Sequence, residues 1–139
     1  MSCPLSFYFS ANDPNFFTKT IVLNDSTTNY LAQVFITAPI YNQCGQVIGS
    51  KVSTDTIQQV GPNQYVVNID STYTFTHRGS VSWNVTFNNT IPSVLYPTHQ
   101  LFQSNIVSTT GIYLGKKGYV SIVANDNGIR NVTITFTKN

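Results

Sequence analysis

The sequence predicts a single all-β domain over residues 1–139, either an eight-stranded antiparallel β-barrel or a two-sheet β-sandwich. Apolar and polar residues alternate through most of the chain, which is the two-residue period of a half-buried strand. Turn residues recur between these segments, and no segment has a convincing helical pattern. Closing a sheet on itself removes its exposed edges, but periodicity alone does not choose between the barrel and the sandwich.

The first two expected strands follow an irregular arm. Two prolines and a turn cluster interrupt residues 1–15, so we expect no regular structure there. Phe16–Leu23 alternates and is the first expected strand. After a cluster of Asn, Ser and Thr residues comes the second strand, Tyr30–Tyr41, where Pro39 indicates an edge or a bulge.

Three further strands form the middle of the chain. Gln46–Gln59 contains Gly49, which indicates the kind of bend that barrels use at corners. Gln64–Thr76 lies between a Gly-Pro-Asn turn and a His-Arg-Gly turn. Ser80–Asn88 has the clearest alternation, with Val, Trp, Val and Phe on one face and Ser, Asn, Thr and Asn on the other.

The last three expected strands are Leu101–Ser108, Lys117–Ala124 and Ile129–Lys138. A longer connection that contains two prolines precedes the first of them. The Asn-Gly pair between the last two is the strongest hairpin signal in the chain.

A glycine loop over residues 109–120 is the most specific motif. Gly111, Gly115 and Gly118 are spaced four and then three residues apart, with aromatic and aliphatic residues between them. Glycine is used where the backbone needs positive φ or a close approach, so we expect a tight, packed loop that leads into a strand. The loop resembles the glycine signature of the allene oxide cyclase and dirigent barrel superfamily, and the resemblance extends over roughly Tyr30 to Phe136.

The resemblance implies an eight-stranded barrel, commonly assembled as a trimer, that binds hydrophobic substrates in its interior. The catalytic groups of the family transfer poorly. Allene oxide cyclases resemble one another in a carboxylate that is usually Glu, but this chain has no Glu, and Asp25 in a turn is the nearest substitute. The family's pocket cysteine falls near Ser53, and Lys117 occupies the place of an arginine in dirigents, where a lysine loses the bidentate fork.

Charge and composition exclude several classes of protein. Only 9% of residues are charged, against about 25% in ordinary soluble domains, and the net charge is +2. The basic residues form no stripe, so we expect no nucleic acid partner. We also expect no membrane partner and no secretory signal, because no apolar stretch approaches ~20 residues and Met1–Pro4 lacks a basic region.

We expect no metal site and no cofactor. Cys3 and Cys44 are the only cysteines, and their spacing is not that of a metal or redox motif. Together with His77 and His99 they provide too few clustered ligands for zinc. A disulfide between the two cysteines and two free thiols both remain open.

Four residues are candidates for a barrel pocket: Asp55, Tyr73, Trp83 and Lys117. Asp55 shares a strand face with Lys51. If this face points into the barrel, the two residues would form a buried and functional charged pair. If it points outward, they would form a solvated pair, which is the arrangement we expect. Trp83 could line a pocket, but we expect it to anchor the core. For Lys117 we expect a solvated loop tip rather than an anion site.

The expected function is that of a non-catalytic structural or interaction module, a homotrimer, in a virion or an extracellular particle. Low charge and a surface rich in Thr, Asn and Ser motivate this expectation, because weak self-repulsion permits association.

The alternative is an isomerase-like or cyclase-like enzyme, or a stereochemical chaperone, acting on a small hydrophobic ligand in the barrel. Acid–base roles would then fall to Asp55, Asp25 or Lys117, with Tyr73 and Trp83 packing the substrate.

A third possibility, a carbohydrate-binding domain, needs loop aromatics such as Tyr96 and Tyr113 grouped on one rim. The barrel interior discriminates between the first two functions. A water-filled cavity with convergent polar groups supports chemistry, and an interior filled by large side chains excludes it.

Overall fold

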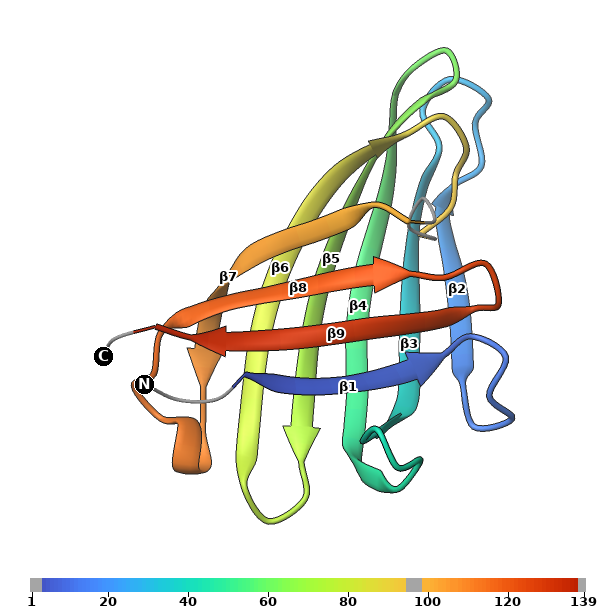
Figure 1. The fold of residues 1–139 in the computed structure, drawn as a ribbon. Helices are drawn as coiled ribbons and strands as arrows, with labels where there is room; N and C mark the ends of the chain where they lie inside the picture. The colour runs from blue at the N-terminus through green and yellow to red at the C-terminus, as the bar shows by residue number, and fades with distance from the viewer. Residues whose placement is uncertain (1–3, 95–98, 138–139) are drawn as a thin grey trace.

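A computed structural model describes residues 4–94 and 99–137 (Figure 1). These residues form nine antiparallel strands and one short 3-10 turn. In chain order the elements are β1 (Leu5–Ser10), β2 (Phe17–Asn24), β3 (Leu31–Tyr41), β4 (Val47–Gly61), β5 (Gln64–Phe75), β6 (Gly79–Asn89), β7 (Leu101–Thr109), η1 (Gly111–Tyr113), β8 (Gly118–Ala124) and β9 (Ile129–Phe136).

Eight of these strands close into an antiparallel barrel. Each strand from β3 to β9 pairs with the next, β9 pairs with β1, and β1 returns to β3 through the register pair Tyr8 and Tyr41. β1, β8 and β9 cross in front of the steeply running β3–β6 in Figure 1. The barrel prediction is therefore confirmed, and the sandwich alternative is wrong.

The set of strands in the ring differs from the expected set. The expected irregular arm contains β1, which pairs with β9 over six register pairs from Leu5 to Ser10. Leu5, Phe7 and Phe9 alternate with polar or outward residues, and the two phenylalanines are buried in the core. The prolines flank this short strand instead of interrupting it, so the expectation of an irregular arm was wrong.

The first expected strand, Phe16–Leu23, corresponds closely to β2, but β2 lies outside the ring. It pairs with β3 alone among the described strands, and every one of its residues is exposed. β3 has room for both neighbours because β2 covers Leu31–Thr37, whereas β1 meets β3 at Tyr41.

The barrel interior is filled by inward-facing side chains. Trp83, Tyr73 and Phe7 are the largest of the fully buried side chains, and aliphatic residues of β3, β5, β8 and β9 surround them. Burying one such large apolar side chain stabilises the fold by about 1.5–3 kcal/mol. We therefore expect this aromatic centre to contribute strongly to the stability of the barrel.

The glycine loop joins two turns at one end of the barrel. A Cβ on Gly79 would lie 2.2 Å from the carbonyl oxygen of Thr110, and one on Gly111 would lie 2.2 Å from that of Arg78. Both glycines also have positive φ, +134° and +65°. Only glycine allows these two backbones to approach so closely, and the loop is tight and packed as expected.

Among the described residues, no helix has the length and apolar character needed to cross a membrane.

Candidate functional site

Polar side chains gather on the interior faces of β4, β5 and β6. Their positions follow from the strand register, which places Ser53 beside Ser71 and Ser71 beside Trp83. In the neighbouring rows, Lys51 pairs with Tyr73, and Asp55 with an isoleucine of β5. These side chains face inward because alternation assigns every second residue of a strand to the core.

Asp55 and Lys51 are buried, 1% and 3% exposed, so the expectation that their face is solvated was wrong. Sequence pattern gave little guidance on β4, because the outward residues Val52 and Thr54 are no more polar than the inward ones. The face is decided by the apolar residues at the corresponding positions of the neighbouring strands, which close over it.

Burial perturbs both charged groups. It raises the pKa of Asp55 from 3.8 to about 6, although the positive charge of Lys51 opposes this rise. It lowers the pKa of Lys51 from 10.5 to about 8, partly offset by Asp55 and reinforced by Arg130. The ammonium of Lys51 also lies over the ring of Phe9, 5.1 Å from its centroid.

A small cavity of about 30 Å³ adjoins this charged cluster. Lys51, Asp55 and Arg130 contribute its polar lining, and the half-buried side chains of Phe16 and Val94 are among the apolar residues that line it. Arg130 is buried, and its Nη1 donates a hydrogen bond to the carbonyl of Gly128 at 2.6 Å. The cavity has room for about one or two water molecules and none for an organic substrate.

Five buried polar atoms of the interior have no hydrogen-bond partner among the described residues. They are Ser53 Oγ, Asp55 Oδ1, Ser71 Oγ, Tyr73 OH and Trp83 Nε1. Burial raises the pKa of the Tyr73 phenol, so this group remains protonated at neutral pH. The interior thus holds donors, an acceptor and two titratable groups that could exchange protons, but they are close-packed.

Of the four candidate residues, Asp55, Tyr73 and Trp83 lie together in the interior and Lys117 does not. Lys117 is exposed just before β8, and its carbonyl accepts a hydrogen bond from the Thr137 amide at 2.8 Å. Val120, Ile122 and Ala124 of β8 point inward, so the alternate positions point outward. This exposure agrees with the solvated loop tip expected for Lys117, and a role for this residue in a pocket stays a prediction. Whether the other three have a function stays a prediction.

Two further expectations concern residues in turns and loops. Asp25 is exposed in the turn after β2, far in sequence from the interior cluster on β4. Tyr113 is buried, 4% exposed, and stacks on Phe136, so it does not belong to an aromatic rim; Tyr96 lies outside the described residues.

The structure describes no metal site. No group of three or more His, Cys, Asp or Glu side chains gathers in the described ranges. Cys44 is exposed and free, and Cys3 lies outside the described residues.

A second pocket, which sequence reasoning missed, lies at the end of the barrel next to the glycine loop. Its volume is about 320 Å³. Its lining comes from β1, the start of β4, the β5–β6 turn and η1: Leu5, Ser6, Phe7, Ile48, Phe75, Thr76, Arg78 and Tyr113. No local motif predicts it, because four separate segments meet there only after the barrel has closed.

Comparison with known proteins supports the fold. No protein-family model and no curated protein matches the sequence. A solved structure of a pyocyanin demethylase matches 97% of this chain and 100% of its own, with a TM-score of 0.70 and 12% identity. A solved structure of a pterocarpan synthase dirigent protein matches 99% of this chain and 88% of its own, with a TM-score of 0.62 and 14% identity. These matches show a barrel of the dirigent and allene oxide cyclase type, which confirms the resemblance at the level of fold.

Proposed function

We propose that this chain is a non-catalytic structural or interaction module that acts as a homo-oligomer. The single observation that carries the proposal is the filled interior. Trp83, Tyr73 and Phe7 occupy the centre of the barrel, and about 30 Å³ remains beside the charged cluster. Ligand pockets usually measure about 300–1,000 Å³, so the interior has no space in which a substrate could meet Asp55.

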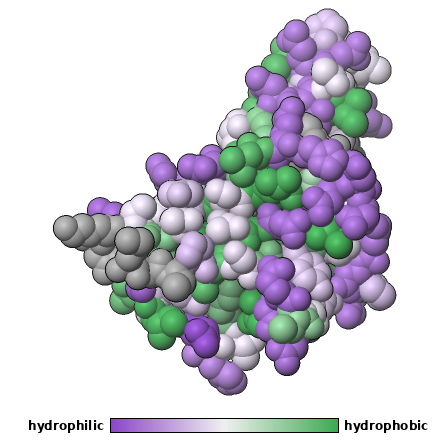
Figure 2. All heavy atoms as spheres, viewed as in Figure 1, coloured by the Kyte–Doolittle hydropathy of each residue, from purple (hydrophilic) through white to green (hydrophobic). Residues whose placement is uncertain are grey.

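The outer surface supports association. Figure 2 shows hydrophilic atoms over much of one face, broken by separate hydrophobic patches. With a net charge of +2, the chain repels copies of itself only weakly. β2 is the strand best placed for contact, because Phe17, Val22 and Leu23 on it are 63%, 46% and 56% exposed.

β2 also carries an unpaired strand edge. Among the described strands β2 pairs only with β3, so its other edge presents backbone N–H and C=O groups. An exposed apolar edge is a template for another strand, and we propose a second copy of this chain as its occupant. The family resemblance implies a trimer as the assembled state.

Sedimentation velocity at micromolar concentration tests the assembly. We expect the native chain to sediment as a trimer and Ile21→Lys on β2 to sediment as a monomer. Val107→Lys, on β7, is the matched control because Val107 is 64% exposed on a strand inside the ring. A native chain that sediments as a clean monomer would contradict the proposal, and equal behaviour of the two variants would contradict the role of β2.

The proposed setting is a virion or an extracellular particle. Support comes from the outer faces of β5 and β6, where amides and hydroxyls bond to one another. Asn68 Nδ2 donates to Thr86 Oγ1 at 2.8 Å, and the hydroxyls of Thr72 and Ser82 are 2.7 Å apart. Quantitative mass spectrometry of purified particles should find the chain enriched over the host lysate, and depletion from the particles would contradict this setting.

The buried charges favour a second candidate function, that of an enzyme or stereochemical chaperone for a small hydrophobic ligand. A carboxyl with a pKa near 6 beside an amine with a pKa near 8 is an arrangement suited to proton transfer. This function requires the barrel to open. A hydrophobic epoxide added to methyl-labelled protein should then shift the Ile69 methyl signal beside Asp55, and an unchanged signal would count against this function.

A further inference from the structure

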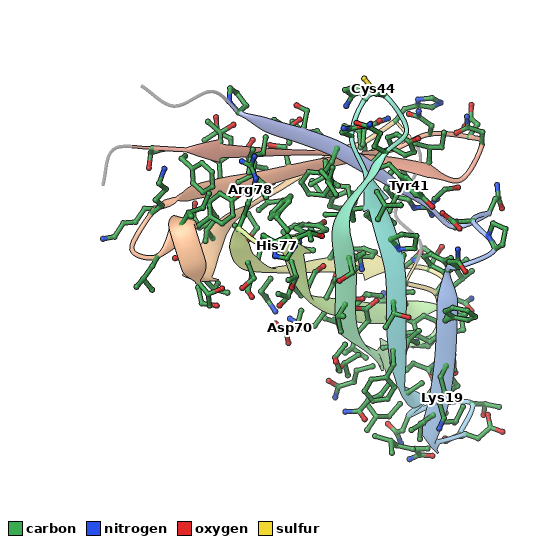
Figure 3. All side chains as sticks on the ribbon, turned by 90° about the horizontal axis from the view of Figure 1, so that it is seen from below. Lys19, Tyr41, Cys44, Asp70, His77 and Arg78 are labelled. Atoms are coloured by element: carbon green, nitrogen blue, oxygen red, sulfur yellow. The ribbon has the colours of Figure 1, made fainter. Side chains whose placement is uncertain are left out.

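The 320 Å³ pocket forms one mouth of the barrel, where the β5–β6 turn and η1 meet β1 and the start of β4. Figure 3 looks toward this end and shows Arg78 on the β5–β6 turn. Arg78 and the β1 residues Leu5, Ser6 and Phe7 line the same pocket. The pocket lies outside the filled interior and stays open to ligands when the barrel is closed.

Arg78 supplies a positive charge that no described side chain neutralises. No hydrogen bond or ion pair of its guanidinium group occurs among the described residues, and the pocket lining contains no Asp. Its backbone is well fixed: its amide donates to the Phe75 carbonyl at 3.0 Å, and its carbonyl accepts from the Ile112 amide at 2.8 Å. The charge is thus held at the rim with its donors available to a ligand.

The floor of the pocket is aromatic and rigid. Phe7 and Phe75 meet edge to face with centroids 5.3 Å apart, and Phe75 meets Tyr113 at 5.5 Å. Each of the three aromatic residues is only 1–4% exposed, so each presents a small apolar surface to the pocket. The side chains of Leu5 and Ile48 complete the apolar wall.

Ser6 and Thr76 also line the pocket. We propose that this mouth pocket binds a small hydrophobic monoanion, with its carboxylate on Arg78 and its apolar body on Phe7, Phe75 and Tyr113. The volume lies at the lower end of the usual range for ligand pockets, which favours a compact ligand.

Titration by ¹H–¹⁵N NMR at low salt tests the site, with trans-cinnamate as the probe. We expect saturable shifts at Thr76, Arg78 and Gly79, and binding in the submillimolar range, about 1 mM or tighter. The neutral analogue cinnamamide has the same ring and should bind several-fold more weakly. Octanoate tests whether the apolar part of the ligand is an acyl chain or a flat ring. Octanoate binding comparable to that of cinnamate indicates a site for an acyl chain, and weaker octanoate binding indicates a site for a flat ring.

Arg78→Gln is the test variant, and Lys19→Gln, far away on β2, is the control with the same change in charge. Arg78→Gln should weaken cinnamate roughly three- to tenfold and leave cinnamamide unchanged. Lys19→Gln should change neither. Because the Arg78 side chain is exposed, the variant should keep the native amide spectrum, which the same experiment verifies.

Salt provides an independent measurement. An ion contact at an exposed rim weakens with ionic strength, so cinnamate binding to the native chain should fall between 10 mM and about 500 mM NaCl, whereas cinnamamide binding should not. The proposal is overturned by unchanged cinnamate affinity in Arg78→Gln, by shifts that map to another surface, or by no saturable binding up to about 10 mM.

Discussion

Replacing Asp55 with asparagine should remove a pH dependence that the buried charges impose on the stability of the barrel. The Asp55 pKa is raised from 3.8 to about 6 by burial. Between these two values the folded state binds a proton that the unfolded state has released. Stability therefore falls as the pH rises from about 4 to about 6, which is opposite to the usual behaviour of a paired carboxylate.

The size of this fall follows from the pKa difference. A difference of about two units corresponds to up to about 3 kcal/mol at pH values above 6. Lys51 acts at the other end of the range, since its pKa is about 8 in the folded state and 10.5 as a free group. Between those values the unfolded state binds the extra proton, so stability recovers as the pH rises above 8, and the minimum lies between about pH 6 and 8.

Other charged groups do not obscure this window. Asp70 and Arg130 act on the pair from β5 and β9 and reinforce both shifts. The hydrogen bond from Tyr41 lowers the pKa of Asp13 below 3.8, so its contribution is lost only at more acid pH. The pair of His99 and an aspartate at 3.0 Å is exposed, and such pairs contribute little.

Urea unfolding at pH values from 4 to 10, followed by the fluorescence of the single tryptophan, measures the profile. The native chain should lose stability from pH 4 to 6, Asp55→Asn should lose that slope, and Asp25→Asn, exposed in a turn, should keep it. A native profile that is flat or rising from pH 4 to 6 would refute the reasoning, as would an equal slope in Asp55→Asn.

Three further predictions concern the packing of the barrel. Gly79→Ala should lower the stability of the fold by more than about 2 kcal/mol, because the added Cβ would clash with the backbone of Thr110. Gly115 also has positive φ but lies in open space, so Gly115→Ala should lose only about 1–2 kcal/mol. Thermal unfolding followed by circular dichroism compares the two variants, and equal losses of stability would contradict the clash. Tyr41→Phe should lower the free energy of unfolding in urea by about 0.5–1.5 kcal/mol, because it removes the hydrogen bond to Asp13. In a spectrophotometric titration of the native chain, the Tyr41 phenol should ionise with a pKa of about 12, and the variant should lack this transition. Trp83→Phe should lower the stability of the fold by about 1–2 kcal/mol, which is less than a typical Trp→Ala change. The loss of packing contacts is partly offset because the variant removes a buried N–H group that has no hydrogen-bond partner. A loss of stability above about 4 kcal/mol would contradict that offset.

Most strands could be predicted from the sequence because their alternation is local. The hairpin at residues 126–128 is a clear case, since Gly128 has the positive φ that an Asn-Gly turn needs. β1 was not predicted because its six residues, with prolines on both sides, are too few to establish an alternation of apolar and polar residues. Its main partner is β9, at the far end of the chain. Whether Phe16–Leu23 lay inside the ring could not be read from alternation either, because the same pattern suits a strand beside the barrel.

The candidate site was less predictable because it depends on distant pairings. Asp55 belongs to a strand with polar residues on both faces, so its orientation follows from the neighbouring strands rather than from β4 itself. The absence of Glu and the presence of Lys117 argue against transferring family chemistry, and this stays a prediction. The mouth pocket around Arg78 gave no signal, because its walls come from segments up to about one hundred residues apart.

The pairing of β1 with β9 has a consequence for the order in which the nascent chain acquires its structure. β2 to β6 form a meander of neighbours that can assemble while the ribosome is still at work, since each strand meets the next within a few residues. Leu5, by contrast, pairs with Ile134, so Phe7 and Phe9 remain exposed until almost the whole chain has been synthesised. The first strand to be made is among the last to be paired, and until then the unfinished protein presents two unprotected phenylalanines to chaperones or to other copies of itself.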